Sequence, residues 1–322
     1  MRAIRVHEPG GPEVLRLEDL PLPEPNSREV RIAISAAGVN FIDIYQREGL
    51  YPLPRPFIAG SEAAGLIEAV GTDVTEFAIG DRVAYSGVLG AYADHAVVAV
   101  DRLVRVPDGV QALQAAALML QGMTAHYLAT DTFPLTVGHT ALVHAAAGGV
   151  GLLLTQIAKQ RGAIVIGTVS TEDKAELAAR AGADHVILYR DHDFVFETER
   201  LVGAHSIDVV YDSVGHDTLR GSMRLLRRRG MVVSYGQSSG PVAPVETQEL
   251  ANAGSIFLTR PSLVDYSSDR DELERRAAEL FGWVASGELS LRIDRQLPLA
   301  EAAEAQRLLA SRATAGKLLL LP

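Results

Sequence analysis

Apolar and polar residues alternate in two different ways along the chain. Up to about residue 123, short β-branched runs are broken by Gly and Pro, as in 29–35 and 80–85, which predicts strands and turns. From about 124 to 260, apolar runs alternate with helical patterns, and the predicted strands are 141–144, 164–168, 185–188, 207–212, 231–235 and 256–259. Strands separated by helices predict an α/β fold with a doubly wound parallel sheet.

The pattern changes again after the sixth predicted strand. A charged helix is expected at 269–285, a second helix at 300–311, and an apolar run closes the chain at 317–322. With 322 residues the chain is long enough for two cores. We therefore expect one domain from 1–123 and 265–322, and a second domain from 124–264.

A strand, a turn of small residues and a helix follow one another at 140–158. Ala146, Gly148 and Gly151 occupy the three glycine positions of the Rossmann dinucleotide fingerprint, and Gly149 and Val150 lie between them. Such a turn lets the backbone approach a pyrophosphate at the helix N-terminus. Taken alone, the same pattern also fits an ordinary tight turn between a strand and a helix.

The end of the second Rossmann strand favours NADPH over NADH. An NAD-binding strand usually ends in an acidic residue, whereas this strand ends at Ser170 and Lys174 follows within one helical turn. A hydroxyl and an ammonium suit the charge and acceptors of a 2′-phosphate. Glu172 and Asp173 are interpreted as first-turn helix carboxylates that face solvent.

Charge and composition narrow the possible partners. The formal net charge is −10, so no broad basic surface is expected for nucleic acid or anionic lipid. No apolar stretch reaches the length of a membrane span, and the charged N-terminal residues do not resemble a signal peptide, so we expect no membrane partner and a cytoplasmic location. The chain has no Cys, which removes disulfides and thiolate metal sites.

Several short blocks, taken in order, resemble the zinc-free quinone oxidoreductase branch of the medium-chain dehydrogenase/reductase superfamily. They lie at 7–15, 37–45, 60–65, 80–83, 90–92, 144–151 and 211–215, and blocks at 229–240, 259–263 and 311–314 are similar to bacterial NADPH:quinone reductases. The resemblance implies a GroES-like, mainly β substrate domain beside a Rossmann NADPH-binding domain.

The same resemblance argues against zinc chemistry. Zinc alcohol dehydrogenases of the superfamily carry a Cys near the position of Asn40 or Phe41 and a His in a Gly-His-Glu block, which here reads Gly60-Ser61-Glu62. Without a polarising metal, hydride should pass to an acceptor that is already electron-poor, and a conjugated quinone is such an acceptor.

By the family pattern, four residues on the substrate side are candidates for catalysis. Asn40 could hydrogen-bond the ribose or the acceptor oxygen, and Asp43 could orient Asn40 or Tyr45, or simply cap the helix that begins there. Tyr45 and Tyr51 each provide a ring on which a quinone could stack and a phenol that could donate to its oxygen. Solvent or Tyr45 could supply the proton.

Further cofactor-binding residues are expected beyond the phosphate turn, some from the resemblance and others because they follow the predicted Rossmann strands or could add a charge at the 2′-phosphate. They are Phe41, Thr124, Tyr127, Tyr189, Ser213, Tyr235, Gly236, Gln237, Ser238, Thr259, Arg260, Pro261 and Arg312. Arg190 is the alternative to Arg312 at the 2′-phosphate. Gln121 stands where some relatives carry Lys and could still hydrogen-bond. His126 and His144 are expected to be structural, since neither has a triad partner nearby in sequence.

Three further expectations complete the interpretation of the sequence. The basic run Arg227-Arg228-Arg229 is predicted to be a solvated helix end. The family resemblance implies a homodimer that pairs the last Rossmann strand, 256–259, across a two-fold axis. The alternatives to quinone reduction are an NADPH-dependent reductase of 2-alkenals or enoyl thioesters, and a protein that binds NADPH without catalysis.

Overall fold

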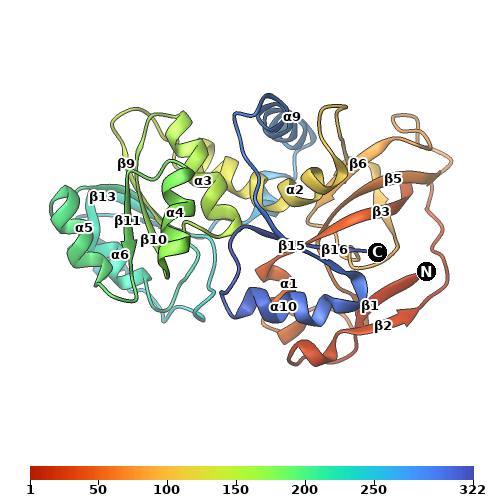
Figure 1. The fold of residues 1–322 in the computed structure, drawn as a ribbon, viewed down its shortest axis with the longest axis horizontal. Coiled ribbons are helices and arrows are strands. Elements are labelled where there is room, and N and C mark those ends of the chain that lie inside the picture. The colour runs from red at the N-terminus through yellow and green to blue at the C-terminus, as the bar shows by residue number, and fades with distance from the viewer. The chain divides into compact units, whose positions relative to one another are not determined.

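Six parallel strands form the sheet predicted from the apolar runs after residue 124. The structure is a computed structural model that describes residues 1–322 (Figure 1). The sheet order is β11-β10-β9-β12-β13-β14, and the strands are β9 (Thr140–His144), β10 (Ile164–Val169), β11 (His185–Leu188), β12 (Ile207–Asp212), β13 (Leu226–Ser234) and β14 (Phe257–Thr259). The order runs outward from β9 in both directions, so the predicted doubly wound α/β fold is confirmed.

Helices cover both faces of this sheet. The helices of this region are α3 (Gly149–Gln160), α4 (Glu172–Arg180), α5 (Phe194–Val202), α6 (Leu219–Leu225), α7 (Thr247–Asn252) and α8 (Leu263–Tyr266). Helices α3 and α4 pack against each other and on β9, β10 and β11, whereas α5 and α6 form a second pair (Figure 1). Because both faces are covered, the central strands β9 and β12 are almost continuously buried.

The prediction for Arg227, Arg228 and Arg229 was wrong. Helix α6 ends at Leu225, and the three arginines belong to β13, which starts five residues before the predicted strand. Leu226 is fully buried and pairs with Ile207 of β12, so β13 begins here. The strand is irregular after this pair, because its register shifts before Val209 and Arg229 has a φ of 62°. The arginines are exposed, as expected, but as part of a strand end.

The chain divides into two units, Met1–Met123 with Tyr266–Pro322 and Thr124–Asp265. The first unit contains two sheets. One has the order β2-β1-β4, and the other has the order β15-β16-β3-β5-β6-β8 with β7 paired to β3. Their strands are β1 (Arg2–Val6), β2 (Arg16–Asp19), β3 (Glu29–Val39), β4 (Phe57–Ile58), β5 (Glu62–Val70), β6 (Arg82–Ser86), β7 (His95–Ala99), β8 (Val104–Arg105), β15 (Ile293–Pro298) and β16 (Lys317–Leu321).

Residues from both ends of the chain build the core of the first unit. Strand β16 pairs with β3, with Leu318 opposite Val39, and Leu318 and Leu320 are buried in the same core as side chains of β3 and β5. The helices here are α1 (Phe41–Glu48), α2 (Ala112–Tyr127), which continues into the second unit as the π-helical turn η3 (Leu128–Thr132), α9 (Arg270–Ser286) and α10 (Ala302–Ala310). Short 3₁₀ turns are η1 (Pro12–Val14), η2 (Val100–Arg102) and η4 (Leu299–Glu301). No helix is both long and apolar enough to span a membrane.

Candidate active site

Small residues build the turn between β9 and α3. Ala145 follows β9 with a φ of 52°, which turns the chain sharply, and Gly148 is the N-cap of α3. A side chain at Gly151 would collide with the backbone of Ala145 and Ala146. The close approach of turn and helix therefore requires glycine at position 151.

Ala146 shows how the turn accommodates alanine at the first position of the fingerprint. Its side chain is fully buried, and a Cβ added to Gly167 of β10 would lie 2.8 Å from the Ala146 methyl carbon. One methyl group fills the space between turn and strand, so the pair of Ala146 and Gly167 packs closely without glycine at both positions.

The first turn of α3 suits an anionic group. No side chain caps this helix, so Gly149 and Val150 offer their backbone N–H groups at its N-terminus. Uncapped amides and the helix dipole together favour phosphate binding. The residues present therefore fit the pyrophosphate of a dinucleotide.

Strand register places two of the predicted 2′-phosphate residues side by side. In the β10–β11 pair, Val169 is opposite Leu188, so the next residues, Ser170 and Tyr189, leave the sheet at the same edge. The N–H of Tyr189 donates to the carbonyl of Val169 at 3.1 Å. Lys174 follows in the first turn of α4, on the same side of the sheet.

Three charged residues near this edge of the second unit are exposed. Glu172 and Asp173 are exposed in the first turn of α4, as predicted. Arg190 is exposed directly after Tyr189. Arg312 belongs to the first unit, where it follows α10 with a φ of 57°.

Strands β12 and β13 also end together. Asp212 pairs with Ser234, and the N–H of Tyr235 donates to the carbonyl of Asp212 at 2.9 Å. Ser213 and Tyr235 are therefore neighbours, and burial raises the pKa of the Tyr235 phenol although a hydrogen bond with Ser213 opposes the rise. This pair lies at the carboxyl edge of the sheet, where α/β folds bind ligands.

Arg260 holds the neighbouring loop from the end of β14. Its guanidinium donates to the carbonyls of Ser234 at 3.0 Å and Gly236 at 3.1 Å. The N–H of Ser238 donates to the carbonyl of Ser213 at 3.1 Å, so the loop is tied to its neighbour on both sides. The other predicted residues of this edge are Gln237, Thr259 and Pro261.

His144 lies in a buried hydrogen-bond chain beneath the phosphate turn. Its Nδ1 is 2.9 Å from Thr168 Oγ1 and its Nε2 is 2.9 Å from Ser222 Oγ, and Phe194 packs edge-on at 4.9 Å. Burial lowers the pKa of His144, although the charge of Asp212 opposes it. A neutral imidazole with both nitrogens satisfied supports the structural role expected for His144. His126 is also fully buried, and its Nδ1 lies 3.2 Å from Thr130 Oγ1.

In the first unit, three aromatic rings gather around α1. The Tyr45 ring is 6.1 Å from that of Phe41 and meets that of Tyr51 edge-on at 5.5 Å. The N–H of Tyr51 donates to the carbonyl of Tyr45 at 3.2 Å, and Tyr51 is 36% exposed. The two tyrosines therefore form one aromatic surface, with Tyr51 at its solvent side.

Asn40, in contrast, is 3% exposed and fully engaged by protein atoms. Its Nδ2 donates to Glu62 Oε2 at 2.9 Å and to the Gly38 carbonyl at 3.3 Å. Its Oδ1 accepts from Lys317 Nζ at 2.9 Å and from Gln121 Nε2 at 3.5 Å. Since an amide offers two donors and two acceptor sites, the side chain that we expected to bind ribose or substrate has no hydrogen-bond capacity left in this structure.

Asp43 is also buried, at 1% exposed. Its Oδ2 accepts from the backbone N–H of Asn40 at 2.9 Å and from the Tyr92 phenol at 2.8 Å, and its Oδ1 accepts from Ser61 Oγ at 3.0 Å. Burial raises the pKa of Asp43 from an ordinary 3.8 to about 6, and these hydrogen bonds oppose the rise. The hydrogen bond from the Asn40 backbone N–H to Asp43 caps the start of α1 and also holds the backbone of Asn40 in place. A single contact therefore serves the capping role and the orienting role.

Thr124 and Tyr127, expected near the cofactor, lie in the last turn of α2. Thr124 is 7% exposed and Tyr127 is 2% exposed. Little of the Tyr127 side chain is therefore available to a ligand in this structure.

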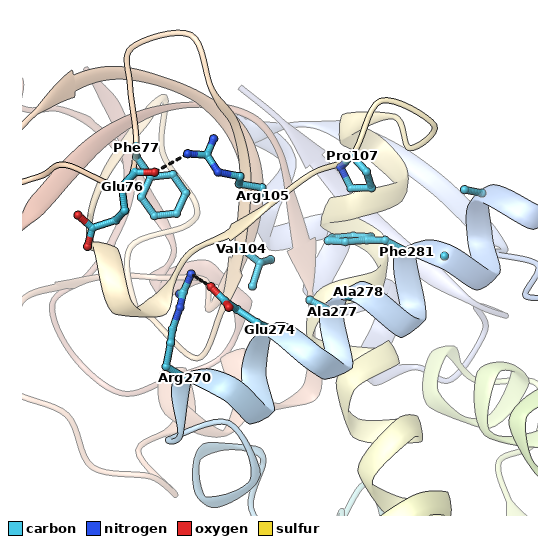
Figure 2. A pocket seen from close by; sticks show the side chains of 12 residues that line it. Glu76, Phe77, Val104, Arg105, Pro107, Arg270, Glu274, Ala277, Ala278 and Phe281 are labelled. Atoms are coloured by element: carbon cyan, nitrogen blue, oxygen red, sulfur yellow. Dashed lines mark hydrogen bonds and ion pairs between the residues drawn. The ribbon is translucent and has the colours of Figure 1, made fainter.

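A pocket of about 540 Å³ lies elsewhere in the first unit. Figure 2 shows α9 along one side of it, with Phe281 and Ala277 facing Val104 and Pro107. The guanidinium of Arg105 lies over the Phe77 ring at 4.8 Å. None of the predicted site residues lines this pocket, so it is not the site considered above.

Comparisons with known proteins agree with this geometry. Models described as an alcohol dehydrogenase GroES-like domain and a zinc-binding dehydrogenase match residues 26–108 and 181–320. A quinone oxidoreductase of Pseudomonas aeruginosa is 47% identical over 97% of both chains. The chain belongs to the quinone oxidoreductase family of the medium-chain dehydrogenase/reductase superfamily.

Two other members of the superfamily are similar over the whole chain. The crystal structure of Escherichia coli quinone oxidoreductase complexed with NADPH superposes with a TM-score of 0.98, at 43% identity over 100% of both chains. A 2-haloacrylate reductase of a Burkholderia species is 41% identical over 98% of both chains. The family therefore includes reductases of acceptors other than quinones.

The donor atoms at Asn40 do not fit the zinc of zinc-binding dehydrogenases. This quinone oxidoreductase family member has no Cys, and no group of three or more His, Cys, Asp or Glu side chains is arranged to hold a metal ion. The Lys317 ammonium already occupies the space beside Glu62. A hydroxyl, an amide and an ammonium do not make a zinc site.

Lys317, Glu62 and Tyr92 are the residues that sequence analysis missed. In the sequence Lys317 only opens a terminal apolar run, yet in the structure its ammonium pairs with Glu62, and their side chains are 2% and 0% exposed. Glu62 Oε1 also accepts from the N–H of Leu120. A single Lys that opens a buried apolar strand is a signal for such a pair, since a buried ammonium needs a partner.

Proposed function

We propose that this protein reduces quinones with NADPH by hydride transfer, without a metal. The observation that carries the proposal is the likeness over the whole chain to a quinone oxidoreductase crystallised with NADPH. The uncapped, glycine-lined start of α3 supports it from this chain's own residues. When bound, NADPH would supply the hydride from C4 of its nicotinamide.

The second unit would bind the cofactor at the carboxyl edge of its sheet. The amides of Gly149, Val150 and Gly151 would hold the pyrophosphate. Ser170, Lys174 and Tyr189 would bind the 2′-phosphate, joined by Arg190 or Arg312. Ser213 and the loops after β13 and β14 would hold the nicotinamide end.

The first unit would bind the acceptor on the aromatic surface of Tyr45 and Tyr51. Their rings offer a flat apolar face for a quinone, and a phenol can donate to an oxygen on which negative charge develops. Asn40 and Asp43, being buried, would act by fixing the start of α1 instead of touching the acceptor. The proton comes from solvent or from Tyr45.

Two finer features belong to the same proposal. The enzyme works as a homodimer, for which the free outer edge of β14 and the 55% exposure of Phe257 provide a surface. It works in the cytoplasm, which cell fractionation tests.

A substrate panel tests the reaction. We expect NADPH oxidation with 1,2-naphthoquinone to be faster than with a 2-alkenal, a crotonyl thioester or 2-chloroacrylate. The 2-haloacrylate reductase among the relatives makes conjugated C=C bonds the second candidate acceptor. If the enzyme reduces the C=C substrates rapidly and does not reduce the quinone, conjugated C=C bonds become the first candidate acceptor and quinones the second.

The tyrosines test the acceptor site. We expect Tyr45→Leu, which removes the ring, to raise the quinone KM at least tenfold, and Tyr45→Phe and Tyr51→Phe to lower kcat by more than twofold. The affinity for NADPH should not change. Variants that keep the wild-type kinetics would place the acceptor elsewhere.

Lys174 tests the cofactor preference. Lys174→Glu should weaken NADPH binding by tenfold or more while changing NADH binding little, because a carboxylate repels the 2′-phosphate. Arg180→Glu is the matched control, since it makes the same change of charge at the far end of α4. An unchanged NADPH/NADH preference in Lys174→Glu would argue against this assignment.

A further inference from the structure

Tyr92 connects two sequence blocks to which the reaction above gives no role. The residue closes the block at 90–92, is fully buried, and packs over Gly60 of the Gly-Ser-Glu block. Gly60 has a φ of +89°, and a side chain there would collide with the Tyr92 ring. The phenol donates to Asp43 Oδ2 at 2.8 Å.

The Asp43 carboxylate accepts all three of its hydrogen bonds from N–H or O–H donors. The backbone N–H of Asn40 comes from the start of α1 itself, whereas the hydroxyls of Ser61 and Tyr92 come from other segments. No cation touches the carboxylate. The charged groups that face it are Lys317 and, beyond the Tyr92 phenol, Glu62, and these two pair with each other.

We propose that Tyr92 is a positioning residue for the acceptor site. Its hydrogen bond to the Asp43 carboxylate keeps that group able to accept from the backbone N–H of Asn40, which holds the N-terminus of α1. Two residues beyond Asp43, the same helix carries Tyr45, whose ring meets Tyr51. The inference rests on the proposed function in one respect: it takes Tyr45 and Tyr51 as the surface that meets the acceptor.

A proton on Asp43 would disturb this arrangement. The backbone N–H of Asn40 cannot accept a hydrogen bond, so the carboxyl proton must be donated to Ser61 or Tyr92. The hydroxyl that accepts it must rotate and stop donating to Asp43. Burial already raises the pKa of Asp43 to about 6. Loss of the Tyr92 donor removes stabilisation of the charged form and moves the protonation closer to neutral pH.

Tyr92→Phe tests this role, with Tyr85→Phe as the matched control. Tyr85 is equally buried in the same unit, and its hydroxyl has no hydrogen-bond partner. We expect the acidic limb of kcat/KM for 1,2-naphthoquinone to move up by about one pH unit in Tyr92→Phe. The profile of Tyr85→Phe should match wild type, and the NADPH dissociation constant should stay the same in both.

A profile of Tyr92→Phe that superimposes on wild type would overturn the inference, and so would a uniform loss of activity at every pH. Ser61→Ala provides a second variant with the same expected direction, because it removes the other hydroxyl from Asp43.

The failure of the proposed function can be recognised separately. If wild type reduces no quinone, the pH dependence of thermal unfolding still reports the protonation of Asp43. We then expect the midpoint of that dependence to lie higher in Tyr92→Phe than in wild type. Equal midpoints would overturn the role of Tyr92 without reference to any substrate.

Discussion

Lys317 Nζ donates to Asn40 Oδ1 at 2.9 Å, although the two residues are 277 positions apart in the chain. The contact joins the first residue of β16 to the residue that precedes α1. Gly38 leaves room for it, since a Cβ there would lie 2.6 Å from Lys317 Cε and would collide with Glu62. One ammonium therefore ties the end of the chain to the start of the helix that carries Tyr45.

The buried pair of Lys317 and Glu62 predicts a large loss of stability when one partner is removed. In Lys317→Met the Glu62 carboxylate stays buried without its cation, and we expect the free energy of unfolding to fall by about 3–5 kcal/mol. Urea denaturation measures it. The double variant Lys317→Met with Glu62→Gln should recover a large part of the loss.

Lys159 offers the control for that experiment. Its pair with Asp184 has side chains 33% and 35% exposed, so Lys159→Met should cost only about 1 kcal/mol. Equal losses for the two lysine variants would show that burial of the Lys317 pair has no energetic consequence.

The pKa of Asp43 predicts how the free energy of unfolding depends on pH. The value is raised from 3.8 to about 6 in the folded protein, so the folded state holds this proton more tightly than the unfolded state. The contribution of Asp43 to stability is therefore fully present below about pH 4 and is lost as pH rises through about 6, a change of about 3 kcal/mol. The difference between wild type and Asp43→Asn should show this fall.

Asp184 should behave with the opposite sign. Partial burial raises the pKa of Asp184, but the hydrogen bond of Lys159, that of the Val165 N–H and the charge of Lys159 together outweigh this and lower it. Its contribution is present at neutral pH and is lost as pH falls through the lowered pKa. If the stability differences of Asp43→Asn and Asp184→Asn follow the same trend with pH, one of the two assignments is wrong.

Gly151→Ala tests the phosphate turn. The added methyl group would collide with the backbone of Ala145 and Ala146, so the turn must shift, and we expect NADPH to bind at least tenfold more weakly. Isothermal titration calorimetry measures the affinity. Gly282→Ala is the control, because nothing lies within 4 Å of a Cβ there, and in a helix it should stabilise the protein by about 0.5–1 kcal/mol without a change in NADPH affinity.

Phe257→Glu tests the proposed dimer. Phe257 lies on β14 and is 55% exposed, and a charge at that edge should prevent strand pairing between two copies. Sedimentation equilibrium should show a dimer for wild type and a monomer for the variant. Phe196→Glu is the control, since Phe196 is 64% exposed on α5, which packs towards the opposite edge of the sheet. Dissociation by both substitutions, or by neither, would argue against an interface at β14.

The fold follows largely from local pattern. The six parallel strands lie close to the predicted segments, because short apolar runs between helices identify strands buried on both faces. The beginning of β13 did not follow from that pattern. Three consecutive arginines give no apolar signal, and the early start of β13 depends on the pairing of Leu226 with Ile207.

The amino-acid sequence alone determined the α/β class and the glycine turn, because both depend on residues within about 20 positions of one another. It also indicated the family, because several short blocks follow one another in the order typical of that family. Only the tertiary structure decided that Asn40 and Asp43 are buried and fully hydrogen-bonded, and that Lys317, Glu62 and Tyr92 surround them. The physical reason is that hydrogen bonds of buried polar groups join segments separated by up to 277 residues. Their partners are set by how the sheets of the first unit pack, which no local pattern encodes.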